Sequence, residues 1–292
     1  PRSAGKLYKE AVANRWLIGA DIPSGVAGLT VQDANDVKSA LGKCQFVFSA
    51  LEMSKDAIKA LEEEYAANGI PVVSNASANR WAEDVPMLIP EINADHVSII
   101  AEQQKHHGWK KGFIAVKPNC SIQSYVPALT PFLKNGIKAI NVCTYQAISG
   151  AGKTFDIWPE MVGNVIPFIG GEEEKSEKEP LKVWGKFAGD HIEIARKPLI
   201  SAQCYRVAVQ EGHTAAVSVS FENKPSIDEM ISVGDQNDMP LDVRLRRKIV
   251  EHSIQCRARV VGKCDGDIAG SKHGNAGLRG RGLGGVAVVA EV

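Results

Sequence analysis

Short apolar runs and longer segments of helical periodicity alternate along the first 116 residues. Cys44 to Ser49, Ile70 to Ser74 and Gly112 to Val116 have the pattern of short buried strands. Between the first two, Ser54 to Asn68 has the pattern of a helix, with a serine cap at its start and a glycine after its end. This alternation of strands and helices predicts a parallel, doubly wound sheet.

The pattern changes after Pro118. Three longer segments rich in Val, Ile and Thr predict a mixed or antiparallel sheet: Ile137 to Ile148, Ala202 to Glu211 and Thr214 to Phe221. Helices are predicted near Glu172–Lys186, Ser226–Val233 and Leu241–Cys256. The final segment, Gly274 to Val292, is rich in glycine and then apolar, and we expect it to form a helix that packs back onto the first domain.

These patterns predict an α/β fold of two domains. Residues 1–118 with 274–292 form a doubly wound nucleotide-binding domain, and 119–273 form an α+β domain with a mixed sheet. Such a nucleotide-binding domain normally opens with a strand, a G-x-G-x-x-G turn and a helix, and no such loop occurs near Pro1. We therefore expect this domain to be incomplete at its N-terminus, without the first strand–loop–helix–strand unit.

Composition limits the possible classes of function. Lys and Arg number 34, as do Asp and Glu, so no global field favours nucleic acid, and no basic stripe is visible. The apolar runs are far shorter than a membrane span. The six cysteines follow neither a disulfide-rich nor a metal-ligand spacing, which predicts a reducing, cytoplasmic location and no metal.

Cys120 lies where a predicted strand gives way to a predicted helix. Pro118 stops the apolar run that ends at Val116, and Ser121 to Asn135 has the pattern of a helix ending at Gly136. The free N–H groups and positive dipole end of a helix stabilise a thiolate, which is the nucleophilic form of cysteine. A lone cysteine is more often a buried apolar filler, and the Pro118-Asn119 and Ser121 that flank Cys120 are what favour a nucleophile.

Arg206 and His213 lie seven residues apart in a stretch rich in Val and Ala. The guanidinium is a fixed cation suited to carboxylates, and the imidazole can donate or accept a proton near neutral pH. Arg206 could instead form a surface salt bridge, and His213 could be a strand-edge histidine bonded to backbone. Together with a thiolate at Cys120, the two residues suggest acyl chemistry on an acidic substrate.

Several short motifs resemble one known family in their order and spacing. They include Arg2-Ser3-Ala4-Gly5, Phe48-Ser49-Ala50-Leu51, Ser74-Asn75-Ala76-Ser77, Pro118-Asn119-Cys120-Ser121, Gln146-Ala147-Ile148-Ser149-Gly150, Gly171-Glu172-Glu173-Glu174-Lys175 and Arg206 to His213. From Pro1 to about Phe221, the sequence resembles the aspartate-semialdehyde dehydrogenases of archaea and fungi.

The resemblance implies roles for the catalytic and substrate-binding residues. Cys120 would be the nucleophile, His213 the acid/base group and Gln146 the side chain that orients the acyl intermediate. The substrate-binding residues would be Arg206 for the α-carboxylate, Glu172 for the ammonium, Lys175 and Arg80 for phosphate, and Asn119 as a neighbouring contact. Without the resemblance, Glu172 and Lys175 would be an ordinary surface pair on one helix face.

The resemblance also implies an NADP site. Arginine near the adenosine 2′-phosphate favours NADP over NAD, because a phosphate dianion suits a bidentate donor. The implied cofactor-binding residues are Arg2, Ser3, Ser49, Ala50, Ser149 and Gly150.

The implied reaction is the NADP-dependent reductive dephosphorylation of L-aspartyl 4-phosphate to L-aspartate 4-semialdehyde through a cysteine thioester. It would serve lysine, methionine and threonine biosynthesis, with small-molecule substrate and phosphate as ligands, in a homodimer or homotetramer. One alternative is a related acyl reductase, for malonyl-CoA or N-acetyl-glutamyl phosphate. Another is a non-catalytic, truncated homologue that only dimerises, since the dinucleotide loop is missing.

Overall fold

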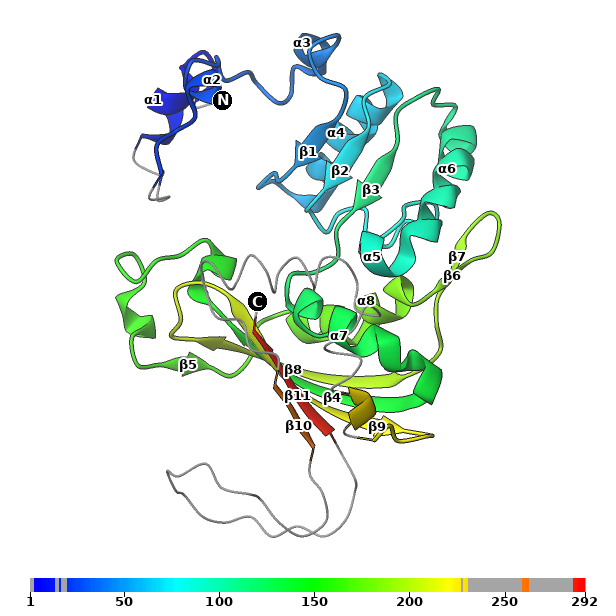
Figure 1. Ribbon diagram of the computed structural model, residues 1–292. Coiled ribbons are helices and arrows are strands. Elements are labelled where there is room, and N and C mark those ends of the chain that lie inside the picture. Colours follow the sequence, from blue (N-terminus) through cyan, green and yellow to red (C-terminus); the bar gives the residue numbers. More distant parts are fainter. Residues whose placement is uncertain are drawn as a thin grey trace. The chain divides into compact units, whose positions relative to one another are not determined.

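Figure 1 shows the computed structural model, which describes residues 3–13, 16, 20–226 and 228–230, together with the backbone of 259–262 and 286–291. The chain divides into two compact units. The first comprises Pro1–Asn79 and Ile100–Ala115, and the second comprises Arg80–Ile99 and Val116–Val292.

The first unit contains a three-stranded sheet in the order β1-β2-β3. Strands β1 (Val47–Ser49) and β2 (Val72–Ser74) pair in parallel, and helix α4 (Lys55–Ala67) connects them. Strand β3 (Ile114–Val116) lies next to β2. The predicted strand–helix alternation and parallel pairing are therefore confirmed. The other helices of this unit are α1 (Tyr8–Val12), α2 (Ser24–Ala27), α3 (Val37–Ala40) and α6 (Ile100–His107).

Helix α4 begins and ends where its sequence signals lie. The Ser54 side chain accepts a hydrogen bond of 3.3 Å from the Ala57 N–H, one of the donors that a helix start leaves without an intrahelical partner. Gly69 ends the helix with a φ of +83°, a left-handed conformation that glycine adopts at little cost. Ile58 and Leu61 are buried on the inner face of the helix.

The second unit is built on a six-stranded mixed sheet in the order β10-β11-β9-β4-β8-β5. The central strand β4 runs parallel to β8 and antiparallel to β9, which confirms the predicted mixed sheet. The six strands of this sheet are β4 (Ile137–Gln146), β5 (Val165–Ile166), β8 (Leu199–Val207), β9 (His213–Phe221), β10 (Arg259–Gly262) and β11 (Val286–Glu291). A separate hairpin consists of β6 (Lys186–Phe187) and β7 (Ile192–Glu193).

Strand register brings three of the predicted site residues side by side. Gln146 at the end of β4 lies opposite Arg206 on β8 and opposite His213 on β9. Residues opposite one another on neighbouring strands project from the same face of a sheet. The register alone therefore gathers these three side chains at one end of the sheet.

The two faces of this sheet differ in burial. Val142 and Thr144 on β4 are buried, whereas Asn141 and Tyr145 on the same strand are exposed. Tyr145 stacks on Tyr205 of β8, with ring centroids 5.9 Å apart, on the exposed side.

The predicted helix from Ser121 to Asn135 is broken into three short pieces: η2 (Ser121–Ser124), α7 (Val126–Leu129) and η3 (Thr130–Asn135). The prediction of one continuous helix was wrong because Pro127 and Pro131 each lack an N–H and favour positions in a first helical turn. The predicted end at Gly136 is confirmed, and this glycine has a φ of +68°.

The C-terminal segment does not form the expected helix where it is described. Residues Val286–Glu291 form strand β11, which pairs antiparallel with β9 and so lies in the sheet of the second unit. The helix prediction was wrong here because Val286, Val288 and Val289 are β-branched and favour a pleated strand.

Helix α8 (Glu172–Val183) packs along β8, as Figure 1 shows. Glu173 and Glu177, one turn apart, accept hydrogen bonds from the backbone N–H groups of Cys204 and Ala202 on this strand. Pro180 lies inside the helix and has no N–H for the carbonyl of Ser176, four residues earlier. That carbonyl accepts a 2.8 Å hydrogen bond from the hydroxyl of the buried Tyr125 instead.

Residues Arg80–Ile99 belong to the second unit, although the sequence boundary was placed near Pro118. Backbone hydrogen bonds join Leu88 and Pro86 to Val116, and His96 Nε2 lies 3.1 Å from the Gly185 carbonyl oxygen. The remaining short helices of this unit are α5 (Pro90–Asn93), η1 (Ala94–Ile99), η4 (Ile148–Ala151) and η5 (Pro159–Met161).

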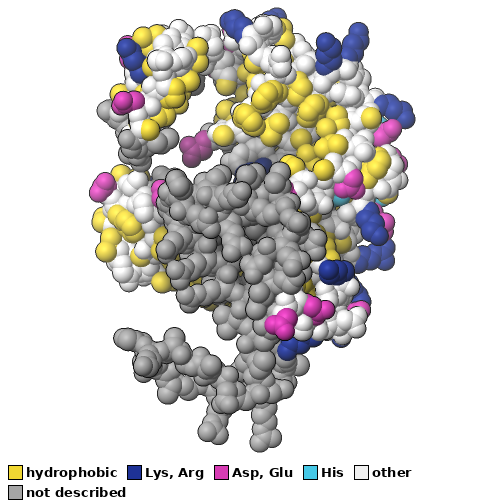
Figure 2. All heavy atoms as spheres, in the orientation of Figure 1, with side chains coloured by type: hydrophobic (Ala, Val, Ile, Leu, Met, Phe, Trp, Pro, Cys, Tyr) yellow, Lys and Arg dark blue, Asp and Glu magenta, His cyan; other side chains and the backbone are white. Residues whose placement is uncertain are grey.

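Two predicted helices extend beyond the described part of the chain. Residues 228–230 are helical, but the rest of Ser226–Val233 after residue 230 lies outside the described residues, as does all of Leu241–Cys256. Among the helices that are described, none combines the length and apolar composition needed to cross a bilayer. On the face shown in Figure 2, acidic and basic side chains of the described residues are interspersed.

Candidate active site

Cys120 and His213 lie in direct contact. Cys120 immediately precedes η2, and its Sγ lies 3.3 Å from Nε2 of His213, the first residue of β9. Cys120 is exposed, so a small molecule in solution can reach it. The predicted nucleophile and the predicted acid/base group are therefore within hydrogen-bond reach of each other.

The electrostatics of this pair favour its charged form. Packing around the Cys120 sulfur, the largest single influence, raises its pKa, but the hydrogen bond and charge of His213 outweigh it, and the pKa is lower than ordinary for cysteine. Desolvation likewise lowers the pKa of His213, but contact with Cys120 and the Gly212 carbonyl raises it above its ordinary value. Both shifts stabilise thiolate beside imidazolium.

Two backbone groups contact Nδ1, the second ring nitrogen of His213, and hold the imidazole in place. Nδ1 lies 2.9 Å from the Gly212 carbonyl oxygen and 3.2 Å from the Ala147 backbone nitrogen. A doubly protonated ring donates from Nδ1 to Gly212 and from Nε2 to the Cys120 thiolate, while the Ala147 N–H donates to the same Gly212 oxygen at 3.2 Å. The contacts with Cys120 and with the Gly212 carbonyl therefore agree with the charged form, whereas the Ala147 N–H can donate to Nδ1 only when the ring is neutral.

Arg206 and Gly150 both lie close to His213. Arg206 is buried, and its Nη1 donates a 2.7 Å hydrogen bond to the carbonyl oxygen of Ala147. A Cβ atom at Gly150 would lie 3.0 Å from both Arg206 Nη1 and His213 Cε1. The backbone at Gly150, predicted to approach a cofactor, thus packs directly against the guanidinium and the imidazole.

Alanine at position 150 should disturb the Cys120–His213 pair. The added methyl group needs space that Arg206 and His213 occupy, so we expect His213 to move and the pKa of Cys120 to rise by about one unit. The rate of alkylation by iodoacetamide at pH 6.5 should then fall about tenfold, measured by mass spectrometry of the Cys120 peptide. Gly25→Ala is the control, because a Cβ there meets no atom of the described residues within 4 Å. Equal alkylation rates in the two variants would contradict this expectation.

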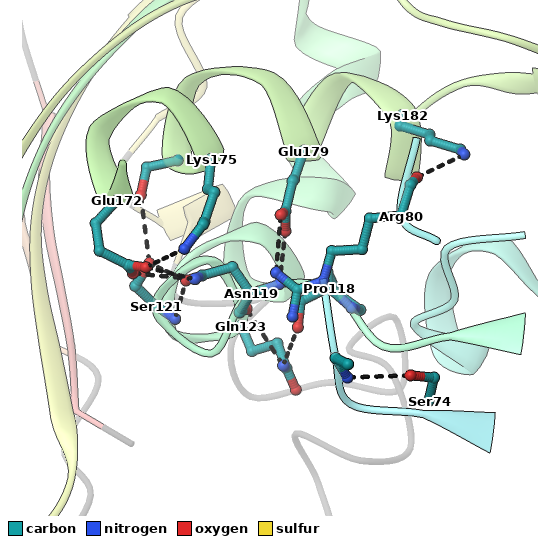
Figure 3. Close-up of polar contacts among 12 residues, drawn as sticks. Ser74, Arg80, Pro118, Asn119, Ser121, Gln123, Glu172, Lys175, Glu179 and Lys182 are labelled. Carbon is teal, nitrogen blue, oxygen red and sulfur yellow. Dashed lines mark hydrogen bonds and ion pairs between the residues drawn. The ribbon is translucent and has the colours of Figure 1, made fainter. Parts of the chain in front are cut away.

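A buried carboxylate, that of Glu172, gathers three of the other predicted residues. It accepts hydrogen bonds from Lys175 Nζ at 2.6 Å, from Asn119 Nδ2 at 3.0 Å and from Gln146 Nε2 at 3.4 Å. Desolvation raises its pKa, but these partners, Lys175 foremost, lower it below the ordinary value for glutamate. Asn119, Gln146, Glu172 and Lys175 therefore form one polar cluster that begins at the residue before Cys120. Figure 3 shows Asn119 and Lys175 directed at the Glu172 carboxylate.

Arg80 takes part in a buried ion pair that the sequence did not indicate. Its Nη1 lies 2.9 Å from Oε1 of Glu179, and both side chains are almost fully buried. Lys182, one turn further along α8, donates to the backbone oxygens of Arg80 and Ala82 at 2.8 and 3.0 Å. Desolvation lowers the pKa of Lys182 to about 8. The sequence did contain one signal for Glu179: it lies seven residues, or two helical turns, after Glu172 and therefore on the same face of the helix.

Of the remaining predicted positions, Ser149 lies in η4 of the second unit, and the others lie in the first unit or outside the described residues. Ser49 ends β1, and its buried Oγ has no hydrogen-bond partner within the described part of the chain, while Ala50 beside it is exposed. Ser3 lies in a turn in which its carbonyl accepts from the Lys6 N–H. Arg2 lies outside the described residues. Among the described residues, no cluster of three or more His, Cys, Asp or Glu side chains could hold a metal ion.

Family models match most of the chain in two parts. Residues 1–100 match the semialdehyde dehydrogenase NAD binding domain, and residues 129–247 match the semialdehyde dehydrogenase dimerisation domain.

Named relatives agree with these models. The aspartate-semialdehyde dehydrogenase of Archaeoglobus fulgidus is 41% identical over 230 residues, which are 78% of this chain and 64% of that protein. The enzyme of the same name from Saccharomyces cerevisiae is 38% identical over 77% of this chain and 63% of its own length. The chain thus spans less than two thirds of the length of these curated relatives.

A solved structure has a similar fold along nearly the whole chain. The crystal structure of aspartate semialdehyde dehydrogenase with NADP from Candida albicans has a TM-score of 0.74 and 26% sequence identity. The match covers 99% of this chain and 83% of that structure.

Proposed function

Since this chain belongs to the semialdehyde dehydrogenase family, we propose that its protein reduces L-aspartyl 4-phosphate to L-aspartate 4-semialdehyde with NADPH, in lysine, methionine and threonine biosynthesis. One observation carries the proposal: the 3.3 Å contact between Cys120 Sγ and His213 Nε2, close to the buried Arg206. This contact gives an activated thiolate beside a cation suited to a carboxylate.

The first step is attack by the thiolate. Cys120 Sγ bonds to the acyl carbon of the acyl phosphate as the bond from that carbon to the phosphate oxygen breaks, giving a thioester and inorganic phosphate. We assign Arg80 and Lys175 to the phosphate. NADPH, when bound, supplies the hydride for reduction of the acyl group.

His213 moves a proton in the last step. The reduced substrate is attached to Cys120 as a thiohemiacetal, and Nε2 of His213 is within hydrogen-bond reach of the sulfur. His213, which is charged at the start, gives its Nε2 proton to the oxygen of the reduced acyl group, and it takes this proton back from the hydroxyl as the carbon–sulfur bond breaks, which releases the aldehyde and restores the thiolate. Its contact with the Gly212 carbonyl holds the ring in place while the proton moves.

Recognition of the amino-acid end uses two buried groups of opposite charge. Arg206 is a planar guanidinium for the α-carboxylate, and the ionised Glu172 suits the substrate ammonium. Gln146 and Asn119 both donate to Glu172, so they hold its carboxylate in a fixed orientation.

One of the residues that we assign to NADP has a buried polar atom with no hydrogen-bond partner in the part of the chain that the structure describes. The buried hydroxyl of Ser49 has no partner among the described residues and lies at the carboxyl end of a parallel strand, where nucleotides bind in doubly wound sheets. We assign Arg2 and Ser3 to the 2′-phosphate, Ser49 and Ala50 to the nicotinamide end, and Ser149 and Gly150 to the same cofactor.

The proposal predicts phosphate-dependent reduction of NADP when the protein is given L-aspartate 4-semialdehyde. The NADPH formed is measured by its absorbance at 340 nm. Malonate semialdehyde should be turned over at least about a hundredfold less efficiently, because it leaves the buried Glu172 without an ammonium partner. Glu172→Gln should raise KM for aspartate semialdehyde about tenfold and narrow that preference. A preference for malonate semialdehyde would support an acyl-CoA reductase instead, and a lack of turnover of either aldehyde would contradict the proposal.

We also propose that the protein is a homodimer or homotetramer. The dimerisation-domain match, and the exposed sheet face that carries Tyr145 and Tyr205, support this association. A monomeric mass in sedimentation equilibrium would contradict it.

A cytoplasmic location and a two-domain division complete the proposal. Among the described residues, Cys44, Cys120, Cys143 and Cys204 are free thiols, as a reducing compartment requires. We place the nucleotide-binding domain before about residue 118 and the catalytic and dimerisation domain after it. Disulfide-bonded forms of these cysteines in protein isolated under alkylating conditions would contradict the location.

A further inference from the structure

We propose that Glu179 is a positioning residue that fixes the phosphate-binding arginine, Arg80, relative to the loop that carries the nucleophile, Cys120. The inference deepens the proposed function and rests on it for the role of Arg80. Glu179 was not among the residues that the sequence indicated.

The geometry centres on a single carboxylate. Glu179 Oε2 accepts a 2.6 Å hydrogen bond from the backbone N–H of Asn119, the residue before Cys120. Its Oε1 accepts a 2.9 Å hydrogen bond from Arg80 Nη1. Glu179 is fully buried, so neither bond is weakened by competition with water (Figure 3).

The partners of Glu179 come from distant parts of the sequence. Arg80 lies 99 residues before Glu179 and Asn119 lies 60 residues before it. Helix α8 holds Arg80 at two points, by its side chain through Glu179 and by its backbone carbonyl through Lys182. The same helix holds Asn119 at two points, by its backbone through Glu179 and by its side-chain amide through Glu172.

Only an ionised carboxylate suits both partners. A backbone N–H and a guanidinium are both donors, and a carboxylate offers an acceptor oxygen to each. A glutamine at position 179 has one acceptor oxygen, and its NH₂ group would face a donor. Loss of either bond would let Arg80 or the Asn119–Cys120 backbone move with respect to the other.

The first experiment compares Glu179→Gln with Glu177→Gln in the phosphate-dependent assay. Glu177 is a matched control, because it lies on the same helix and also accepts a backbone hydrogen bond, from Ala202 at 3.1 Å. We expect Glu179→Gln to raise KM for phosphate about tenfold and Glu177→Gln to leave it within about twofold. Glu179→Asp keeps the charge but has a shorter side chain, so it should also raise KM for phosphate. This second variant tests the inference if the Glu179→Gln variant does not fold.

The second experiment needs no turnover. The pH dependence of iodoacetamide alkylation reports the pKa of Cys120 in each variant. Removing a negative charge near a thiol would by itself lower that pKa. Displacement of Cys120 from His213 would raise it, and we expect a rise of about one unit, or about tenfold slower alkylation at pH 6.5.

The two measurements separate this inference from the proposed function. Failure of the wild-type protein to turn over aspartate semialdehyde would contradict the function, while the alkylation profile would still test Glu179. A raised KM for phosphate with a raised pKa of Cys120 supports the inference. It is overturned if Glu179→Gln and Glu179→Asp match Glu177→Gln in both measurements and differ only in melting temperature.

Discussion

Replacing Cys120 with alanine should lower kcat for aspartate-semialdehyde oxidation by at least about 10⁴-fold. Without the sulfur no thioester can form, and neither Arg206 nor His213 offers another nucleophile of comparable strength. The rate should be measured as phosphate-dependent formation of NADPH, beside a melting curve. We expect an unchanged melting temperature within about 2 °C, because Cys120 is exposed and adds little to the core.

Cys44→Ala is the matched control for this result. Cys44 is also an exposed free thiol, but it belongs to the first unit, where its sulfur lies 3.6 Å from the carbonyl oxygen of Ala40. Its kcat should stay within about twofold of wild type. Comparable rates in Cys120→Ala and Cys44→Ala would refute the assignment of the nucleophile.

Replacing His213 with asparagine should lower kcat by about 10³-fold, as expected for loss of a general acid and base. It should also shift the alkylation of Cys120 to higher pH. In the wild-type protein the hydrogen bond and charge of His213 lower the pKa of this thiol. Without them the thiolate forms only at higher pH, so the alkylation rate at pH 6.5 should fall about tenfold for each unit by which the pKa rises. Well above the pKa of the variant thiol, the rates of variant and wild type should converge.

His191→Asn provides the control for this variant. His191 is exposed and pairs with Asp190, in the turn between β6 and β7. It should change neither kcat nor the alkylation profile. An unshifted profile in His213→Asn would mean that another group activates Cys120, and the proton-transfer role would then have to be reassigned.

The sequence predicted much of the fold because its signals were local. The serine cap and terminal glycine of α4 act within one helical turn, and they define its ends correctly. The apolar periodicity of residues 121–135 predicts one helix, but the segment forms three short pieces because Pro127 and Pro131 favour positions in a first helical turn. The strand at Val286–Glu291 was missed because its partner, β9, lies far away in the sequence and periodicity cannot reveal such a pairing.

The site could be predicted only in part, for a similar reason. The motifs around Cys120 and His213 indicated both residues, and strand register explains how His213 comes to lie beside Gln146 and Arg206. Glu179 resembles every other glutamate in the charged segment Glu172–Val183, where most acidic side chains would be expected to face solvent. What distinguishes it is burial against Arg80 and Asn119, and only the folded chain brings these three together.

Pro180 shows how an irregularity can connect two elements. Because this proline leaves the Ser176 carbonyl without a helical donor, Tyr125 can anchor the segment after η2 to the middle of α8. If residue 180 had a backbone N–H, that N–H would compete with the Tyr125 hydroxyl for the buried carbonyl oxygen of Ser176. Swapping proline for a better helix former at this position would thus strengthen one helix in isolation while loosening the junction between it and its neighbour.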